Sequence, residues 1–198
     1  MPSLEALIAM SGFALAASAT PGPVNIIGAM TGAKHGTWRA LPFVSGATAC
    51  FLTLFFIFGS GILTKSSWVA ALSTPMLLIG SAYLLWMAWQ LARDDGGIRL
   101  VEAQNIPGFW SGVVVQGLNP KAWLAVFSAL SAFVLPLEDQ TTGMIAFALL
   151  FGLICWMSLA AWAWGGARIA QRQMLLFNRI MALVLALSVV WMLIAGML

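Results

Sequence analysis

Thr20-Pro21-Gly22-Pro23 and Asn119-Pro120-Lys121 are the two stretches that decide how this sequence folds. Each begins with a residue that caps helix N-termini well, followed at once by the proline that is favoured in the first helical position. Each stretch nevertheless lies inside a long apolar run that continues on both sides of it. The sequence therefore predicts two membrane-spanning helices that are interrupted part-way, with a second half-helix beginning at each stretch.

The composition places most of the chain in a membrane. Of its 198 residues, 62% are hydrophobic and 8% are charged, and the mean hydropathy is +0.97. A soluble domain carries about 25% charged residues, so a water-soluble fold is excluded. The net charge of +3 comes from basic residues in short segments between apolar runs, which does not indicate a nucleic-acid partner. We expect a single all-α integral membrane domain over residues 1–198.

Six apolar runs are long enough to cross a bilayer, which takes about 20 residues. We expect the interrupted spans, helices 1 and 4, at 4–33 and 107–135, and the others at 40–63, 69–92, 143–167 and 180–198. Pro21 and Pro120 lie half a chain apart, so each half, about 1–92 and 105–198, holds three transmembrane helices. Because three is odd, the second half enters the membrane from the opposite side, which predicts a 3+3 inverted repeat.

The basic residues indicate the orientation of the chain. Of nine lysines and arginines, seven lie in the segments after the first, third and fifth spans, and only Lys65 lies on the other side. Lysine and arginine concentrate in cytoplasmic loops. We therefore expect these three basic segments in the cytoplasm and both termini outside. Lys121 is the one basic residue left, and it falls inside the fourth span.

Lys121 is the only charged residue predicted deep within a span, and such residues are costly in lipid. It lies at the start of a half-helix, where the helix N-terminus already carries about half a positive charge. The break at Pro21 supplies a second N-terminus at similar depth, and Glu5, at the very start of the first span, is the only acidic residue within the predicted spans. This arrangement predicts a site for a carboxylate. Snorkelling toward the headgroups, or bonding to carbonyls freed by the break, are the alternatives for Lys121.

Polar residues near the breaks complete the candidate site. Asn25 and Asn119 are candidate ligands for a solute's amine or side chain, but Asn119 is also expected to cap its helix and Asn25 is as well suited to bond to a neighbouring helix. Gln116 lies one turn before the second break. The candidate substrate-binding residues are Thr20, Pro21, Gly22, Pro23, Asn25, Gln116, Asn119, Pro120 and Lys121. A metal-ion exporter is a further alternative, but it would need carboxylate, imidazole or thiolate ligands that the spans scarcely offer. No nucleophile–base pair is visible, so we do not expect an enzyme, and we expect no cofactor.

The two cysteines, Cys50 and Cys155, lie in the second and fifth spans, which correspond under the predicted repeat. The simplest interpretation is that they pack as small hydrophobic residues. The alternative is a membrane thiol-redox carrier that passes reducing equivalents between them. Against this alternative, neither cysteine lies beside a helix break or in a Cys-x-x-Cys arrangement.

Over essentially its whole length the chain resembles the LysE/RhtB family of amino-acid exporters. The resemblance rests on Pro21-Gly22-Pro23, on Asn119-Pro120-Lys121 and on four glycines after the first motif, Gly32, Gly36, Gly46 and Gly61. Residues 81–89, residues 133–136 and the pair Cys155-Trp156 look most like the cysteine/O-acetylserine exporter branch.

The resemblance implies export of amino acids or close derivatives from the bacterial cytoplasm across the inner membrane, driven by the proton motive force. The implied partners are a small-molecule amino-acid substrate and membrane lipid, with a homodimer left open and no cofactor. One position departs from the family. Many members carry an aspartate where this chain has Phe51, so a conventional Asp or Glu proton carrier is absent. Either the substrate, Lys121 or a group at a loop end carries the proton, or transport is facilitated diffusion or exchange.

Overall fold

The computed structural model describes residues 2–60 and 106–168, together with scattered residues between 78 and 93 and between 173 and 190. Every regular element within these ranges is a helix. The predicted third and sixth spans, 69–92 and 180–198, lie mostly outside the described residues. The structure therefore bears on four of the six predicted spans, and the all-helical fold is confirmed for the part of the chain that it describes.

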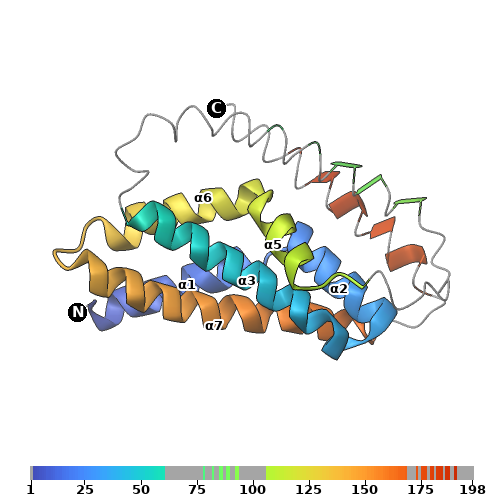
Figure 1. Ribbon diagram of the computed structural model, residues 1–198, viewed down its shortest axis with the longest axis horizontal. Coiled ribbons are helices and arrows are strands. Elements are labelled where there is room, and N and C mark those ends of the chain that lie inside the picture. The colour runs from blue at the N-terminus through green and yellow to red at the C-terminus, as the bar shows by residue number, and fades with distance from the viewer. Residues whose placement is uncertain are drawn as a thin grey trace.

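The described elements form a bundle of long helices lying side by side (Figure 1). In chain order they are α1 (Leu4–Ala19), α2 (Pro23–His35), α3 (Thr37–Gly59), α5 (Phe109–Gly117), α6 (Pro120–Ala129), the π-helix η2 (Leu130–Val134) and α7 (Gln140–Gly166). By length and apolar composition, α3 and α7 can each cross a membrane alone. Two further pairs, α1 with α2 and α5 with α6 and η2, can do so as bent spans.

Both predicted interruptions are present. The axis bends by 60° between α1 and α2 and by 72° between α5 and α6. The second half-helix begins as the sequence predicts: Asn119 is the N-cap, Pro120 is the first helical residue, and the Asn119 side chain accepts the Lys121 N–H at 3.1 Å.

In the first broken span, the helix after the break, α2, begins two residues later than predicted. Thr20 ends α1 as its C-cap, whereas the N-cap of α2 is Gly22 and the first helical residue is Pro23. The cause is the second proline, because a residue that precedes proline is kept out of the helical region. Gly22 is accordingly extended, with φ −167° and ψ 177°, and the helix can start only after it.

The connection between α2 and α3 is also shorter than predicted. The expected loop at 34–39 is reduced to the single residue Gly36, since Lys34 and His35 end α2 and Arg39 belongs to α3. Gly36 has φ 86°, a left-handed conformation that glycine adopts without strain. This one glycine therefore reverses the chain between the two helices.

Glycines bring α2 and α7 into backbone contact. A Cβ added to Gly32 would overlap the carbonyl of Ala163, and one added to Gly166 would overlap the carbonyl of Ala29. Each helix thus presents one glycine and one carbonyl, three residues apart, to the other. Small residues allow such close approach between helices in a membrane. We refer to these four residues as the α2–α7 glycine contact.

The same arrangement joins α3 to α5. A Cβ on Gly46 would overlap the carbonyl of Phe109, and one on Gly112 would overlap the carbonyl of Phe43. Between the two glycine contacts, α3 and α7 pack against each other through aromatic rings, with Phe51 and Phe151 stacked at a centroid distance of 3.8 Å. The bundle is therefore tight on both sides of the region where the two breaks meet.

Candidate functional site

Three successive carbonyl groups at the end of α1 accept hydrogen bonds from side chains of three other helices. The pairs are Asn25 Nδ2 to Ser18 O at 2.7 Å, Trp162 Nε1 to Ala19 O at 3.1 Å and Lys121 Nζ to Thr20 O at 2.9 Å. A helix that ends inside a membrane leaves its last carbonyls without partners, and each would cost several kcal/mol if left unpaired. Donors from α2, α7 and α6 therefore close the first break.

An indole closes the second break in the same way. Trp123 Nε1 donates to the carbonyl of Gly117, the last residue of α5, at 2.8 Å. The Trp123 ring packs edge-on against Phe58 of α3, with centroids 5.2 Å apart. Sequence reasoning did not assign this role to Trp123 or to Trp162, because neither residue carries a local signal for it.

Lys121 connects the two breaks. Its Nζ donates to Thr20 Oγ1 at 2.8 Å as well as to Thr20 O, and the Thr20 hydroxyl in turn donates to Ala16 O. Of the roles that the sequence left open for Lys121, bonding to a carbonyl freed by a break is therefore present. An ammonium has three N–H donors, so one remains for a further acceptor. No carboxylate pairs with this amine in the described part of the chain.

The N-terminus of α2 has main-chain donors that nothing caps. Gly22 has no side chain, and Pro23 has no N–H. The N–H groups of Val24 and Asn25 consequently have no acceptor among residues 2–60 and 106–168, although both residues are buried. The Lys121 amine lies beside this helix end, since a Cβ on Gly22 would be 3.5 Å from Nζ.

The two helix ends are therefore not equivalent. Asn119 Oδ1 already occupies the N-terminus of α6 by accepting the Lys121 N–H. At α2, the partial positive charge of the helix end and the Lys121 ammonium face the same space, and no acidic side chain of the described ranges lies between them. Such an arrangement favours an anion that comes from outside the chain.

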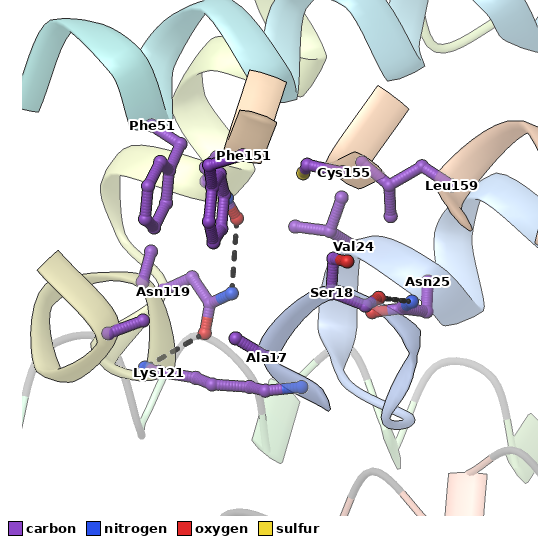
Figure 2. A pocket seen from close by; sticks show the side chains of 13 residues that line it. Ala17, Ser18, Val24, Asn25, Phe51, Asn119, Lys121, Phe151, Cys155 and Leu159 are labelled. Atoms are coloured by element: carbon purple, nitrogen blue, oxygen red, sulfur yellow. Dashed lines mark hydrogen bonds between the residues drawn. The ribbon is translucent and has the colours of Figure 1, made fainter. Parts of the chain in front are cut away.

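A cavity lies where these groups meet (Figure 2). Asn25, Gln116, Asn119 and Lys121 line it, so four of the nine candidate residues share one space. The other five, Thr20, Pro21, Gly22, Pro23 and Pro120, shape the breaks around it and are not part of its wall. About 30 Å³ is open to the centres of water molecules, which is room for about two waters. The cavity is therefore too small in this structure to enclose an amino acid.

Two buried amides in the cavity each keep one polar atom unpaired. Asn119 Nδ2 donates to Gln116 Oε1 at 3.2 Å, which leaves Gln116 Nε2 without an acceptor among the described residues. Asn25 Nδ2 donates to Ser18 O, which leaves Asn25 Oδ1 without a donor in the same ranges. Gln116 and Asn25 are only 6% and 5% exposed. Because buried polar groups are normally paired, the cavity offers a ligand one donor and one acceptor.

The opposite wall of the cavity is apolar and was not predicted. Phe151, Cys155 and Leu159 recur at every fourth position of α7, so they lie on one face of that helix. All three line the cavity. Cys155 Sγ lies 3.9 Å from Thr48 Oγ1 on α3, whereas Cys50 is half-buried and not part of the lining. Both cysteines are free thiols.

A family model that describes the LysE type translocators matches residues 15–197. The chain belongs to the LysE family. The cysteine/O-acetylserine efflux protein of Klebsiella pneumoniae is 30% identical over 179 residues, 90% of each chain. The proteins of the same name from Salmonella paratyphi A and Escherichia coli K12 are 28% identical, over 90% of this chain and 91% of each relative. No solved structure matches the chain.

Family membership confirms the resemblance that the sequence motifs indicated. LysE proteins are translocators, so this LysE protein is a membrane transporter and not an enzyme. Its apolar helices fit a chain that crosses the membrane several times.

Proposed function

We propose that this LysE-family chain exports small amino acids or their close derivatives, such as cysteine and O-acetylserine, from the bacterial cytoplasm across the inner membrane. The solutes are those for which its relatives are named. The observation that carries the proposal is the uncapped N-terminus of α2 beside the Lys121 amine, in a buried cavity without a carboxylate of its own.

In this proposal the carboxylate of the substrate lies between the N–H groups of Val24 and Asn25 and the third N–H of Lys121. Hydrogen bonds of this kind, from an ammonium or a helix N-terminus to a carboxylate, are about twice as strong as neutral ones. Gln116 Nε2 is a further donor for the carboxylate, and Asn25 Oδ1 accepts from the substrate ammonium. The two charged groups of the zwitterion thus supply hydrogen-bond partners to the polar atoms of the cavity that lack one.

Transport requires the cavity to widen, because its present volume admits only water. The bends between α1 and α2 and between α5 and α6 provide two joints beside the site. Substrate entry also replaces part of the contact between Lys121 and Thr20, since both compete for the same amine. Binding at the breaks is thereby linked to a change in how the two broken helices contact each other, as alternating access requires.

We further propose that residues 1–92 and 105–198 form the two halves of a 3+3 inverted repeat within one domain, with both termini outside. Packing within the described part of the chain supports this arrangement. The continuous helix α7 packs on the broken pair α1 and α2, and α3 packs on α5 and α6. Each broken helix thus lies against the continuous helix of the other half, as a two-fold relation between the halves would place it.

The variant Gly22→Ala tests the carboxylate site without changing any charge. The extended backbone at Gly22 suits any residue, and the added methyl would meet Lys121 and Asn25 at 3.5–3.6 Å, an ordinary contact. The methyl would, however, fill the space in which a carboxylate reaches the α2 N-terminus. We expect counterflow of labelled O-acetyl-L-serine in proteoliposomes to fall at least about tenfold, because hydrogen bonds to charged groups contribute about 1.5–3 kcal/mol each.

Gly12→Ala is the matched control, since no atom lies within 4 Å of a Cβ at that position. It should leave counterflow unchanged. Lys121→Gln, which removes the ammonium but keeps a hydrogen-bond donor, should also lose transport. The Gly22→Ala and Lys121→Gln variants should remain folded, as judged by gel filtration and thermal unfolding in detergent. Undiminished counterflow in Gly22→Ala and in Lys121→Gln would refute the site.

A further inference from the structure

We propose that Cys155 determines substrate specificity: with Phe151, Leu159 and Val24 it forms the subsite for the substrate side chain, and this subsite accepts short, uncharged side chains. The inference rests on the proposed function, because it assigns the second end of the same cavity. It concerns which amino acids the chain carries, whereas the carboxylate site concerns the group that all of them share.

The two ends of the cavity differ in chemistry. Lys121, Asn119, Gln116 and Asn25 supply the polar end. Figure 2 shows Cys155 on the side of the cavity away from Lys121. Apart from Lys121, the described residues that line the cavity carry no formal charge. A substrate held by its carboxylate and ammonium at the polar end therefore directs its side chain toward α7.

The α7 wall is fixed in place. Phe151, Cys155 and Leu159 are each no more than 3% exposed, and they belong to one uninterrupted helix of 27 residues. On one side the stacked rings of Phe51 and Phe151 close the wall. Val24, the first residue after Pro23, faces the same space from α2 and is 3% exposed. A substrate side chain in this subsite would thus lie directly between the N–H donors of α2 and the wall of α7.

Cys155 is the smallest side chain of this wall and therefore sets the depth of the subsite. Its sulfur has one weak polar contact, to Thr48 Oγ1 at 3.9 Å, and is otherwise available for contact with a ligand. A charged substrate side chain placed here would lose its hydration, and no side chain of this wall could pair with it, which costs several kcal/mol. An extra methylene that does not fit a tight apolar pocket changes specificity about 10- to 200-fold.

The first test uses Cys155 as its own reporter. The chain has two cysteines, so Cys50→Ser leaves Cys155 as the single thiol, and Cys50 does not line the cavity. The purified full-length variant in proteoliposomes is treated with methyl methanethiosulfonate, whose thiomethyl group is transferred to the Cys155 thiolate while methanesulfinate leaves. We expect O-acetyl-L-serine to slow the labelling at least about fivefold, and L-lysine and L-glutamate to leave its rate unchanged.

The second test measures selectivity by counterflow. Cys155→Ala deepens the subsite, so transport of L-norvaline relative to L-alanine should rise about tenfold. Cys155→Val fills the subsite, so transport of O-acetyl-L-serine relative to L-alanine should fall by a similar factor. Cys50→Ala makes the same chemical change outside the cavity and should leave both ratios unchanged.

The outcomes separate this inference from the proposed function. If counterflow persists but neither Cys155 variant alters the ratios, and O-acetyl-L-serine gives no protection, the subsite is refuted while the carboxylate site stands. If no amino acid undergoes counterflow in the unmodified chain, the proposed function itself fails. Protection by L-lysine or L-glutamate equal to that by O-acetyl-L-serine would also overturn the assignment of short, uncharged side chains.

Discussion

The Lys121 amine donates two hydrogen bonds and has a third N–H available for a further acceptor. Two of its N–H groups hold the carbonyl and hydroxyl of Thr20, so the amine completes the hydrogen bonding at the end of α1. The same position places it beside the uncapped N-terminus of α2. The structural contact and the proposed substrate contact are therefore made by one group, and a substitution at Lys121 affects both. Gly22→Ala separates the two roles better, because it affects only the proposed substrate contact.

The indoles at the breaks give a prediction at the same scale. Trp123→Phe keeps an aromatic ring beside Phe58 but leaves the Gly117 carbonyl without its donor. We expect a loss of about 1–3 kcal/mol in the free energy of unfolding, as for other unpaired buried polar groups. Circular dichroism of the protein in detergent should show a lower thermal midpoint.

Trp110→Phe provides the control for this measurement. Trp110 is 76% exposed, and its ring packs edge-on against that of its neighbour Phe109. Its substitution should leave the midpoint within experimental error. Equal midpoints for the Trp123→Phe and Trp110→Phe variants would show that the indole is not needed to close the break.

At the scale of the elements, the sequence predicted the two breaks but not the start of α2. Both breaks were found because Thr20-Pro21 and Asn119-Pro120 each place a proline directly after a capping residue. The sequence Thr20-Pro21-Gly22-Pro23 contains two such signals, and the second one starts the helix because Gly22 must stay extended before Pro23. Helix ends near Gly36 were missed because a single left-handed glycine replaces the expected loop.

The site was predictable where its residues were polar. Asn25, Gln116, Asn119 and Lys121 stand out because polar side chains are rare in an apolar run, and all four line the cavity. The α7 wall was not predictable, because Cys155 and its neighbours look like any other core residues in a uniformly apolar helix. Contacts such as that between Trp162 and Ala19 depend on how distant helices pack, which a sequence pattern does not contain.

The glycine contacts give a prediction for the helix pairs. Gly28 and Gly32 lie one turn apart on α2, but only Gly32 meets the backbone of α7 closely, since a Cβ on Gly28 would be 3.8 Å from the Leu159 carbonyl. Gly32→Ala forces α2 and α7 apart, so we expect a loss of about 1–3 kcal/mol in stability. Gly28→Ala should cause no loss. Thermal unfolding in detergent distinguishes the two variants. Equal midpoints for Gly32→Ala and Gly28→Ala would contradict the close packing of Gly32 on α7.

At the scale of the whole molecule, the proposed orientation concerns segments outside the described residues. In a chain without cysteines at positions 50 and 155, single cysteines introduced by Arg99→Cys, Arg172→Cys and Lys65→Cys report which side each position faces. A membrane-impermeant maleimide added to intact cells should label only the Lys65→Cys variant. The other two should react only after the membrane is permeabilised, and labelling of either in intact cells would reverse the proposed topology.

The pairing of α2 with α7 also affects how the molecule is made. The partner of the Gly32 surface is Ala163, so α2 is synthesised long before the helix that covers it. The carbonyl of Ala19 likewise lacks its hydrogen-bond donor until Trp162 has been synthesised. Until then the first half of the chain contains an unpaired helix end and an uncovered glycine surface that only the synthesis of α7 can complete. Premature termination before α7 should therefore give a fragment that the cell's membrane quality control degrades.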